Sequence, residues 1–141
     1  MKTDGGLPPV MIVDDDEDDF LLVARRLKQA GVDNTLLPFK NGGDAFMFLK
    51  KFCTGSTVPG KIPCLMFLDI NMAGLSGFDV LMWARQQPAL DSMKIVMLSG
   101  ANEPHDAQIA AKLGANEFLV KFPEPSVFRE LISPANTVRS L

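Results

Sequence analysis

One short apolar run constrains the fold of this chain more than any other stretch. Residues 64–68 are apolar throughout, and the run ends abruptly on a carboxylate, Asp69. Small turn-forming residues follow, and Ser76 and Gly77 then open a helical pattern. A run this short, bounded by turns, is typical of a strand buried on both faces of a parallel sheet. Asp69 would then lie at the carboxyl end of the strand, where open α/β sheets bind their ligands.

Four further apolar runs predict four further strands, at residues 10–13, 35–39, 94–98 and 117–120. Helical periodicity follows each strand, at residues 20–30, 44–52, 77–87, 103–113 and 125–132. Pro38 assigns the second strand to a sheet edge, because proline cannot donate to a central ladder. The strand–helix alternation predicts an α/β fold, a doubly wound five-stranded parallel sheet with helices on both faces.

Composition excludes several functional classes. The chain has 141 residues, the size of one domain, and a net charge of −3 without a basic run, which argues against binding to nucleic acid or an anionic membrane. Its apolar segments are far shorter than the ~20 residues of a membrane span, and its N-terminus lacks the apolar region of a signal peptide. Cys53 and Cys64 form no CxxC pair and the chain has one histidine, so no His/Cys zinc site can form. We expect a cytoplasmic protein whose cysteines are core residues.

Four of the predicted strands end in residues that carry chemistry. These residues are Asp14 and Asp15, Asp69, Ser99 and Lys121. Parallel strands share one carboxyl edge, so the five side chains are expected to lie together. Three carboxylates this close would repel unless a cation were present, and oxygen ligands favour Mg²⁺. One Mg²⁺ and the lysine would balance the three negative charges.

These residues together resemble the receiver domain of two-component response regulators. The resemblance rests on Val13-Asp14-Asp15, on Asp69 followed by Asn71 and Gly77, on Ser99-Gly100 and on Lys121, and it covers residues 10–132. It implies the flavodoxin-like strand order 2-1-3-4-5. It also implies that residues 1–141 are a single receiver domain, with a core at about 10–132 and no output domain.

The resemblance assigns a nucleophile and a metal site. Asp69 would accept a phosphoryl group from the phosphohistidine of a sensor kinase. Asp15 would bind Mg²⁺ directly, Asp14 would assist through water, and Asn71 would supply its backbone carbonyl.

The resemblance also assigns the residues that respond to phosphorylation. Ser99 would donate its hydroxyl to a phosphoryl oxygen, and Lys121 would pair with Asp69 at rest and with the phosphoryl group afterwards. Phe118 matches an aromatic position that changes rotamer as the hydroxyl residue moves. A buried strand phenylalanine needs no such role, and both interpretations stay open.

Two departures from the family pattern affect the loops. Ala73 stands where the family usually has proline, so the loop after Asp69 is less constrained. The family usually has Lys-Pro after the fifth strand, whereas this chain has Lys121-Phe122-Pro123. A cis bond, if present, would therefore be expected between Phe122 and Pro123.

Several other polar and aromatic residues have simpler interpretations. Asp18 and Asp19 favour the positive end of a helix dipole. Asp16 either joins the acidic cluster or faces solvent, and solvent is favoured. His105 is interpreted as a solvated residue near a helix start, and Trp83 as a packing residue.

The resulting hypothesis is a stand-alone phospho-switch rather than an enzyme that turns over a separate substrate. Its partners would be a sensor histidine kinase or histidine phosphotransfer protein and an unidentified downstream protein, with the chain a monomer or weak homodimer. The alternative is a phosphorelay intermediate or phosphate sink, which needs the same site. A hydrolase of the haloacid-dehalogenase kind needs a second aspartate two positions after the nucleophile, where this chain has Asn71.

Overall fold

A computed structural model describes residues 6–55 and 60–132 of the chain. The residues rich in Gly, Pro, Ser and Thr at 54–62 predict a loop, and residues 134–141 have no clear pattern. The tail and the middle of this loop lie outside the described residues. Within the described part, none of the helices combines the length and the apolar character that crossing a bilayer requires.

Five parallel strands form the central sheet. They are β1 (Val10–Val13), β2 (Leu36–Phe39), β3 (Leu65–Asp69), β4 (Lys94–Ser99) and β5 (Glu117–Val120). Their order is β2-β1-β3-β4-β5, and every neighbouring pair is parallel, which confirms the predicted flavodoxin-like topology. Pro38 lies on the edge strand β2, opposite Ile12 of β1.

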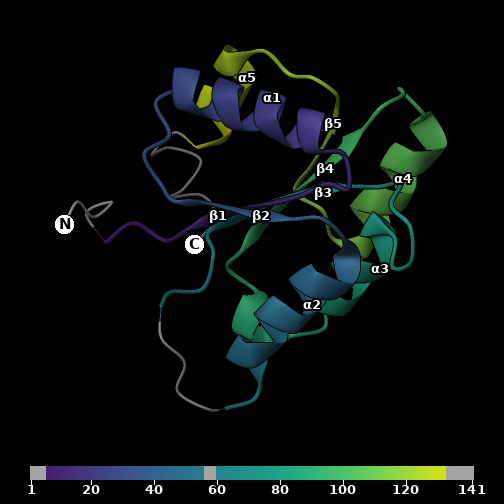
Figure 1. Ribbon diagram of the computed structural model, residues 1–141. Coiled ribbons are helices and arrows are strands. Elements are labelled where there is room, and N and C mark those ends of the chain that lie inside the picture. Colours follow the sequence, from purple (N-terminus) through teal and green to yellow (C-terminus); the bar gives the residue numbers. More distant parts are fainter. Residues whose placement is uncertain (1–5, 56–59, 133–141) are drawn as a thin grey trace.

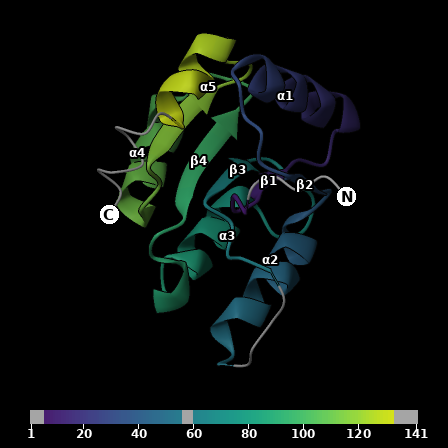
Figure 2. The same ribbon diagram turned by 90° about the vertical axis from the view of Figure 1, so that its left-hand side faces the viewer.

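Helices cover both faces of the sheet. Helices α1 (Glu17–Gln29) and α5 (Pro125–Leu131) lie on one face, and α2 (Gly42–Lys50), α3 (Gly77–Ala84) and α4 (Pro104–Leu113) lie on the other (Figures 1 and 2). Two short 3₁₀ helices, η1 (Lys51–Cys53) and η2 (Pro88–Leu90), follow α2 and α3. This layering is the doubly wound arrangement that the strand–helix alternation predicts.

The sheet separates two hydrophobic cores. Alternate residues of a strand point to opposite faces. In β1, Met11 and Val13 therefore pack toward α2 and α3, while Val10 and Ile12 pack with residues of α1 and α5. All four are almost fully buried. This two-sided burial explains why β1, β3 and β4 are continuous apolar runs rather than alternating ones.

Residues predicted to pack or to face solvent do so. Cys53 and Cys64 are partly buried and pack against one core each. Trp83 meets Phe46 of α2 edge-on, with 4.6 Å between ring centroids. His105 is exposed in the first turn of α4.

Several helix boundaries differ from the prediction by a few residues, and two of them have a clear local cause. Asn41, not Asp44, caps α2, because Asn41 has extended backbone and its Oδ1 accepts from the Asp44 amide at 2.7 Å. Helix α3 ends at Ala84 rather than at residue 87, because Gln87 precedes a proline and adopts extended backbone. At the other end of α3, Ser76 and Asp79 form a reciprocal capping box.

Candidate functional site

The carboxyl ends of β1 and β3 bring three carboxylates together. The register pairs Val13 with Leu68, so the residues that follow, Asp14 and Asp69, are neighbours. Asp14 is 4% exposed and Asp69 is 6% exposed, whereas Asp15 is exposed. Each offers an oxygen atom within 4.8 Å of the other two. The structure thus assembles three of the four predicted metal ligands at the topological switch point of the sheet.

Lys121 is the cation of this cluster. Its Nζ lies 2.8 Å from Asp14 Oδ2 and 3.2 Å from Asp69 Oδ1. It also lies 2.9 Å from Oδ2 of Asp19, on α1. The backbone amide of Lys121 donates to the Ser99 carbonyl at 2.7 Å, which fixes the end of β5 against β4. The ammonium is therefore held among three carboxylates at the sheet edge.

The electrostatics of Asp69 reflect this crowding. Burial raises the pKa of Asp69 to about 6, Lys121 acts against the rise, and the charges of Asp14 and Asp15 add to it. Burial alone would lower the pKa of Lys121, but its hydrogen bonds to Asp14 and Asp19 and the charge of Asp69 raise it above its ordinary value. Lys121 is therefore always charged, while Asp69 ionises only partly below neutral pH.

The donor set fits a hard divalent cation. Asp14, Asp15 and Asp69 offer carboxylate oxygens, which Mg²⁺ prefers. Their three negative charges face one ammonium, and the charges of Asp14 and Asp15 add to the rise that burial causes in the pKa of Asp69. Asn71 lies two residues past β3 with an exposed side chain, and its backbone carbonyl as a fourth ligand stays a prediction.

Gly77 fixes how α3 starts next to Asp69. Its amide donates to the Ile70 carbonyl at 3.0 Å. A Cβ at this position would lie 2.3 Å from the Asp69 carbonyl oxygen, closer than any real contact. Only glycine allows α3 to approach the end of β3 this closely. Ala73 is exposed in the same loop.

Ser99 lies one strand away, at the end of β4. Its side chain is buried, and its hydroxyl donates to the Ala101 carbonyl at 2.7 Å. The Ala101 amide in turn lies 3.2 Å from the hydroxyl oxygen, which accepts its hydrogen bond. In this state the hydroxyl binds its own loop, so any bond to a group on Asp69 requires a rotation about the Ser99 side chain.

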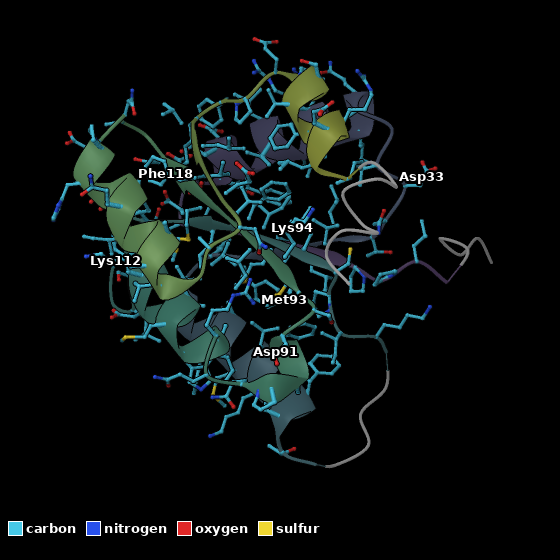
Figure 3. All side chains as sticks on the ribbon, turned by 180° about the vertical axis from the view of Figure 1, so that it is seen from behind. Asp33, Asp91, Met93, Lys94, Lys112 and Phe118 are labelled. Atoms are coloured by element: carbon cyan, nitrogen blue, oxygen red, sulfur yellow. The ribbon has the colours of Figure 1, made fainter. Side chains whose placement is uncertain are left out.

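Phe118 of β5 is half-buried on the α4 side of the sheet (Figure 3). It packs against the core that contains Met97 and Ala110. This position is compatible with simple packing and with a rotamer switch, so the structure leaves both interpretations of Phe118 open.

The contact between Asp19 and Lys121 corrects the interpretation of Asp19 as a helix-dipole residue only. The spacing of Asp19 could have indicated this contact. Asp19 stands four positions before Val23, a buried residue, so both lie on the same face of the helix. Asp18 is exposed in the first turn of α1, where the helix dipole favours a negative charge. Asp16 is also exposed and caps α1, since its Oδ1 accepts from the amides of Asp18 and Asp19.

The loop after β5 differs from the prediction in one detail. The cis peptide bond joins Lys121 to Phe122, one residue before the predicted position at Pro123. Arg26 of α1 donates from one guanidinium nitrogen to the carbonyls of Phe122 at 2.9 Å and Pro123 at 3.0 Å. Helix α1 is thereby tied to the two residues that follow Lys121.

Comparison with known proteins agrees with this geometry. Residues 10–133 match the family described as the response regulator receiver domain. The response regulator Rcp1 of Synechocystis sp. is 29% identical over 121 residues, which cover 84% of this chain and 81% of Rcp1. The structure of Mn²⁺-bound Rcp1 superimposes with a TM-score of 0.75 at 25% identity, covering 92% of this chain and 94% of Rcp1. The bacteriophytochrome response regulator AtBRR gives a TM-score of 0.76 at 27% identity, covering 96% of this chain and 92% of AtBRR.

Proposed function

Because this chain belongs to the response regulator receiver domain family, we propose that it is a phosphorylation-controlled switch whose phosphoacceptor is Asp69. The donor is the phosphohistidine of a sensor histidine kinase or a histidine phosphotransfer protein, and the cytoplasm is the expected location. The observation that carries the proposal is the position of Asp69, a buried carboxylate at a strand end, among Asp14, Asp15 and Lys121.

The proposed reaction is a transfer between two side chains. An Asp69 carboxylate oxygen attacks phosphorus, and an O–P bond forms as the P–N bond to the donor imidazole breaks. The imidazole keeps the electron pair and takes a proton. Asp69 must be ionised to attack, and a pKa of about 6 leaves it ionised in most molecules at neutral pH.

Lys121 and Ser99 are proposed to stabilise the product. Lys121 already lies 3.2 Å from Asp69, so an N–H of its ammonium can turn to a phosphoryl oxygen with little movement. Ser99 would exchange its bond to the Ala101 carbonyl for a bond to the phosphoryl group. Asp15, Asp69 and the Asn71 carbonyl would hold Mg²⁺, with Asp14 assisting through water, and the cation would supply positive charge next to the transferred group.

The proposed output is a change in affinity for a downstream protein. Movement of Ser99 and its loop would reach α4, β5 and α5. Phe118 of β5 packs against the core under α4. The protein would catalyse only its own phosphorylation and dephosphorylation. A relay role would use the same site and end in transfer to another histidine.

Intact-mass measurement tests the phosphoacceptor. Incubation with Mg²⁺ and acetyl phosphate is expected to add one phosphoryl group to the wild type and to Asp33→Asn, an exposed aspartate far from the cluster. Asp69→Asn is expected to gain none. An unmodified wild type, or an Asp69→Asn variant that is modified equally, would contradict the proposal.

A second experiment separates the two outputs. The protein with a labelled phosphoryl group on Asp69 is mixed with a histidine phosphotransfer protein, and transfer of the label is followed. Separately, the affinity of the phosphorylated and unphosphorylated protein for candidate partners is compared. Binding of a protein only to the phosphorylated form supports the switch. Rapid transfer of label with no such binding supports the relay.

Mg²⁺ binding is tested without any phosphoryl donor. The cation is expected to raise the unfolding temperature of the wild type in a concentration-dependent way, since it binds only the folded state. The increase should be much smaller in Asp15→Asn. Asp44→Asn, which changes an exposed carboxylate on α2, is the matched control.

A further inference from the structure

Of the described carboxylates in contact with Lys121, Asp19 is the one that belongs neither to the proposed metal site nor to the phosphoacceptor. The ammonium has three N–H donors and meets three carboxylates. The distances to Asp14 and Asp19 are 2.8 and 2.9 Å, and the distance to Asp69 is longer, at 3.2 Å. The ammonium is thus drawn toward the α1 side of the site, away from Asp69.

The position of Asp19 is set by the fold rather than by a flexible surface side chain. Asp16 caps α1 through the amide of Asp19 itself, at 3.1 Å, which fixes the first turn of the helix. Further along the same helix, Arg26 binds the carbonyls of Phe122 and Pro123. Helix α1 is therefore tied to the chain on the carboxyl side of Lys121. The Asp19 side chain is 28% exposed, so solvent screens its ion pair only in part.

The charge of Asp19 also changes the electrostatic balance of the site. The carboxylates of Asp14, Asp15 and Asp69 would be balanced by Lys121 and one divalent cation. Asp19 adds one negative charge in direct contact with the ammonium. A phosphoryl group, which brings further negative charge, then meets a site with a net negative charge and a lysine whose N–H groups are shared.

We propose that Asp19 is a positioning residue that shares the Lys121 ammonium and so limits how strongly it binds Asp69 and, after transfer, the phosphoryl group. The inference rests on the proposed function of Asp69. Asp19 thereby sets the lifetime of the phosphorylated state, because the ammonium that pairs with Asp19 on α1 binds the phosphoryl group less strongly.

The substitution Asp19→Asn tests this role, since it removes the charge and keeps the size. We expect the phosphorylated protein to lose its phosphoryl group about threefold more slowly, the effect typical of one partly screened ion pair. Asp18→Asn is the matched control, because it removes the same charge one residue earlier from an exposed side chain. It should dephosphorylate at the wild-type rate, and Asp19→Glu should restore most of that rate.

A spectroscopic readout follows the ammonium directly. In the unphosphorylated protein, the ¹⁵Nζ signal of Lys121 is expected to shift in Asp19→Asn and to stay unchanged in Asp18→Asn. This measurement needs no phosphoryl group, so it tests the sharing of Lys121 even where acetyl phosphate fails to modify the wild type. Such a failure would overturn the role of Asp69 and with it the effect on lifetime.

Two results would overturn the inference itself. One is an unchanged Lys121 signal in Asp19→Asn. The other is a dephosphorylation rate of Asp19→Asn that equals that of Asp18→Asn while Asp69→Asn stays unphosphorylated, because the site would then work as proposed without any contribution from Asp19.

Discussion

The amino and carboxyl ends of the same sheet are lined by different kinds of residue. At the amino end, a groove of about 520 Å³ is lined mainly by apolar residues such as Val10, Val32 and Leu65. Asp33 and Lys94 are its charged residues (Figure 3). At the carboxyl end, Asp14 and Asp69 are buried beside one lysine. Burying charge is costly unless the charge is paired, so the buried carboxylates at the carboxyl end are the stronger indication of a functional site.

Among the described residues, a partly buried lysine lies at each end of the sheet, Lys94 at the amino end and Lys121 at the carboxyl end. Lys94 starts β4 and its Nζ donates to the Leu131 carbonyl at 3.0 Å, which ties the strand to α5. Lys121 follows β5 and contacts three carboxylates. A bond to a backbone carbonyl stabilises the packing of two elements, whereas a shared ammonium can change partners during a reaction.

The largest expected effect comes from exchanging each lysine for methionine. Lys121→Met is expected to lower the rate of phosphorylation by acetyl phosphate about a hundredfold, the typical cost of losing one donor to a developing charge. Lys94→Met should leave this rate unchanged. Mass spectrometry over time measures both, and a similar loss in the two variants would remove the distinction between the two ends.

A second pair of substitutions compares two glycines. Gly77→Ala places a Cβ 2.3 Å from the Asp69 carbonyl oxygen, so α3 must move away from β3. We expect a loss of about 3 kcal/mol in the free energy of unfolding, as for an overpacked core. Gly31→Ala, at the groove, meets no atom within 4 Å but has a φ of +91°, so it should cost only about 1 kcal/mol.

Urea unfolding with circular dichroism measures both values. The Gly77→Ala variant should in addition be phosphorylated more slowly, because the displaced contact is with Asp69 itself. Equal destabilisation by the two variants, with unchanged phosphorylation, would show that the approach of α3 to β3 is looser than the structure indicates.

The smallest expected effect concerns pH. The pKa of Asp69 is about 6 in the folded protein and lies near 3.8 when unfolded, so the folded state holds the proton more tightly. Stability of the metal-free wild type should therefore fall as pH rises through this window. Asp69→Asn cannot ionise and should be more stable at about pH 7.5 by about 2 kcal/mol, with the difference shrinking toward about pH 4.

The matching variant at the groove is Asp33→Asn. It makes the same change at an exposed carboxylate away from the cluster and serves as the control for the substitution itself. Denaturant titrations in EDTA at several pH values provide the test. A wild type that gained stability between about pH 4 and pH 6 relative to Asp69→Asn would contradict the raised pKa.

The sequence was sufficient to predict the strands and the polar residues that end them. Short apolar runs indicate strands buried on both sides, and parallel strands share one carboxyl edge, so Asp14 and Asp69 were expected to lie together. Gly77 was recognised as the residue that opens α3. Its close approach to the Asp69 carbonyl depends on the path of the loop, which no local pattern specifies.

Contacts between distant elements were less predictable. Asp19 and Lys121 are 102 positions apart, and their contact depends on how α1 lies across the sheet. The start of α2 was predicted wrongly, with Asp44 as the cap, because Asn41 and Asp44 are both good capping residues three positions apart. The extended backbone of Asn41 decides between them.

The separation of the two cores by the sheet has a consequence for sequence divergence. Residues packed on opposite faces share few contacts, so substitutions under α1 and α5 and substitutions under α2, α3 and α4 should have additive effects on stability. Each face can then diverge at its own pace. The site residues lie at the strand ends, between the two cores, so substitutions on either face can affect them. These positions therefore constrain the divergence of both faces.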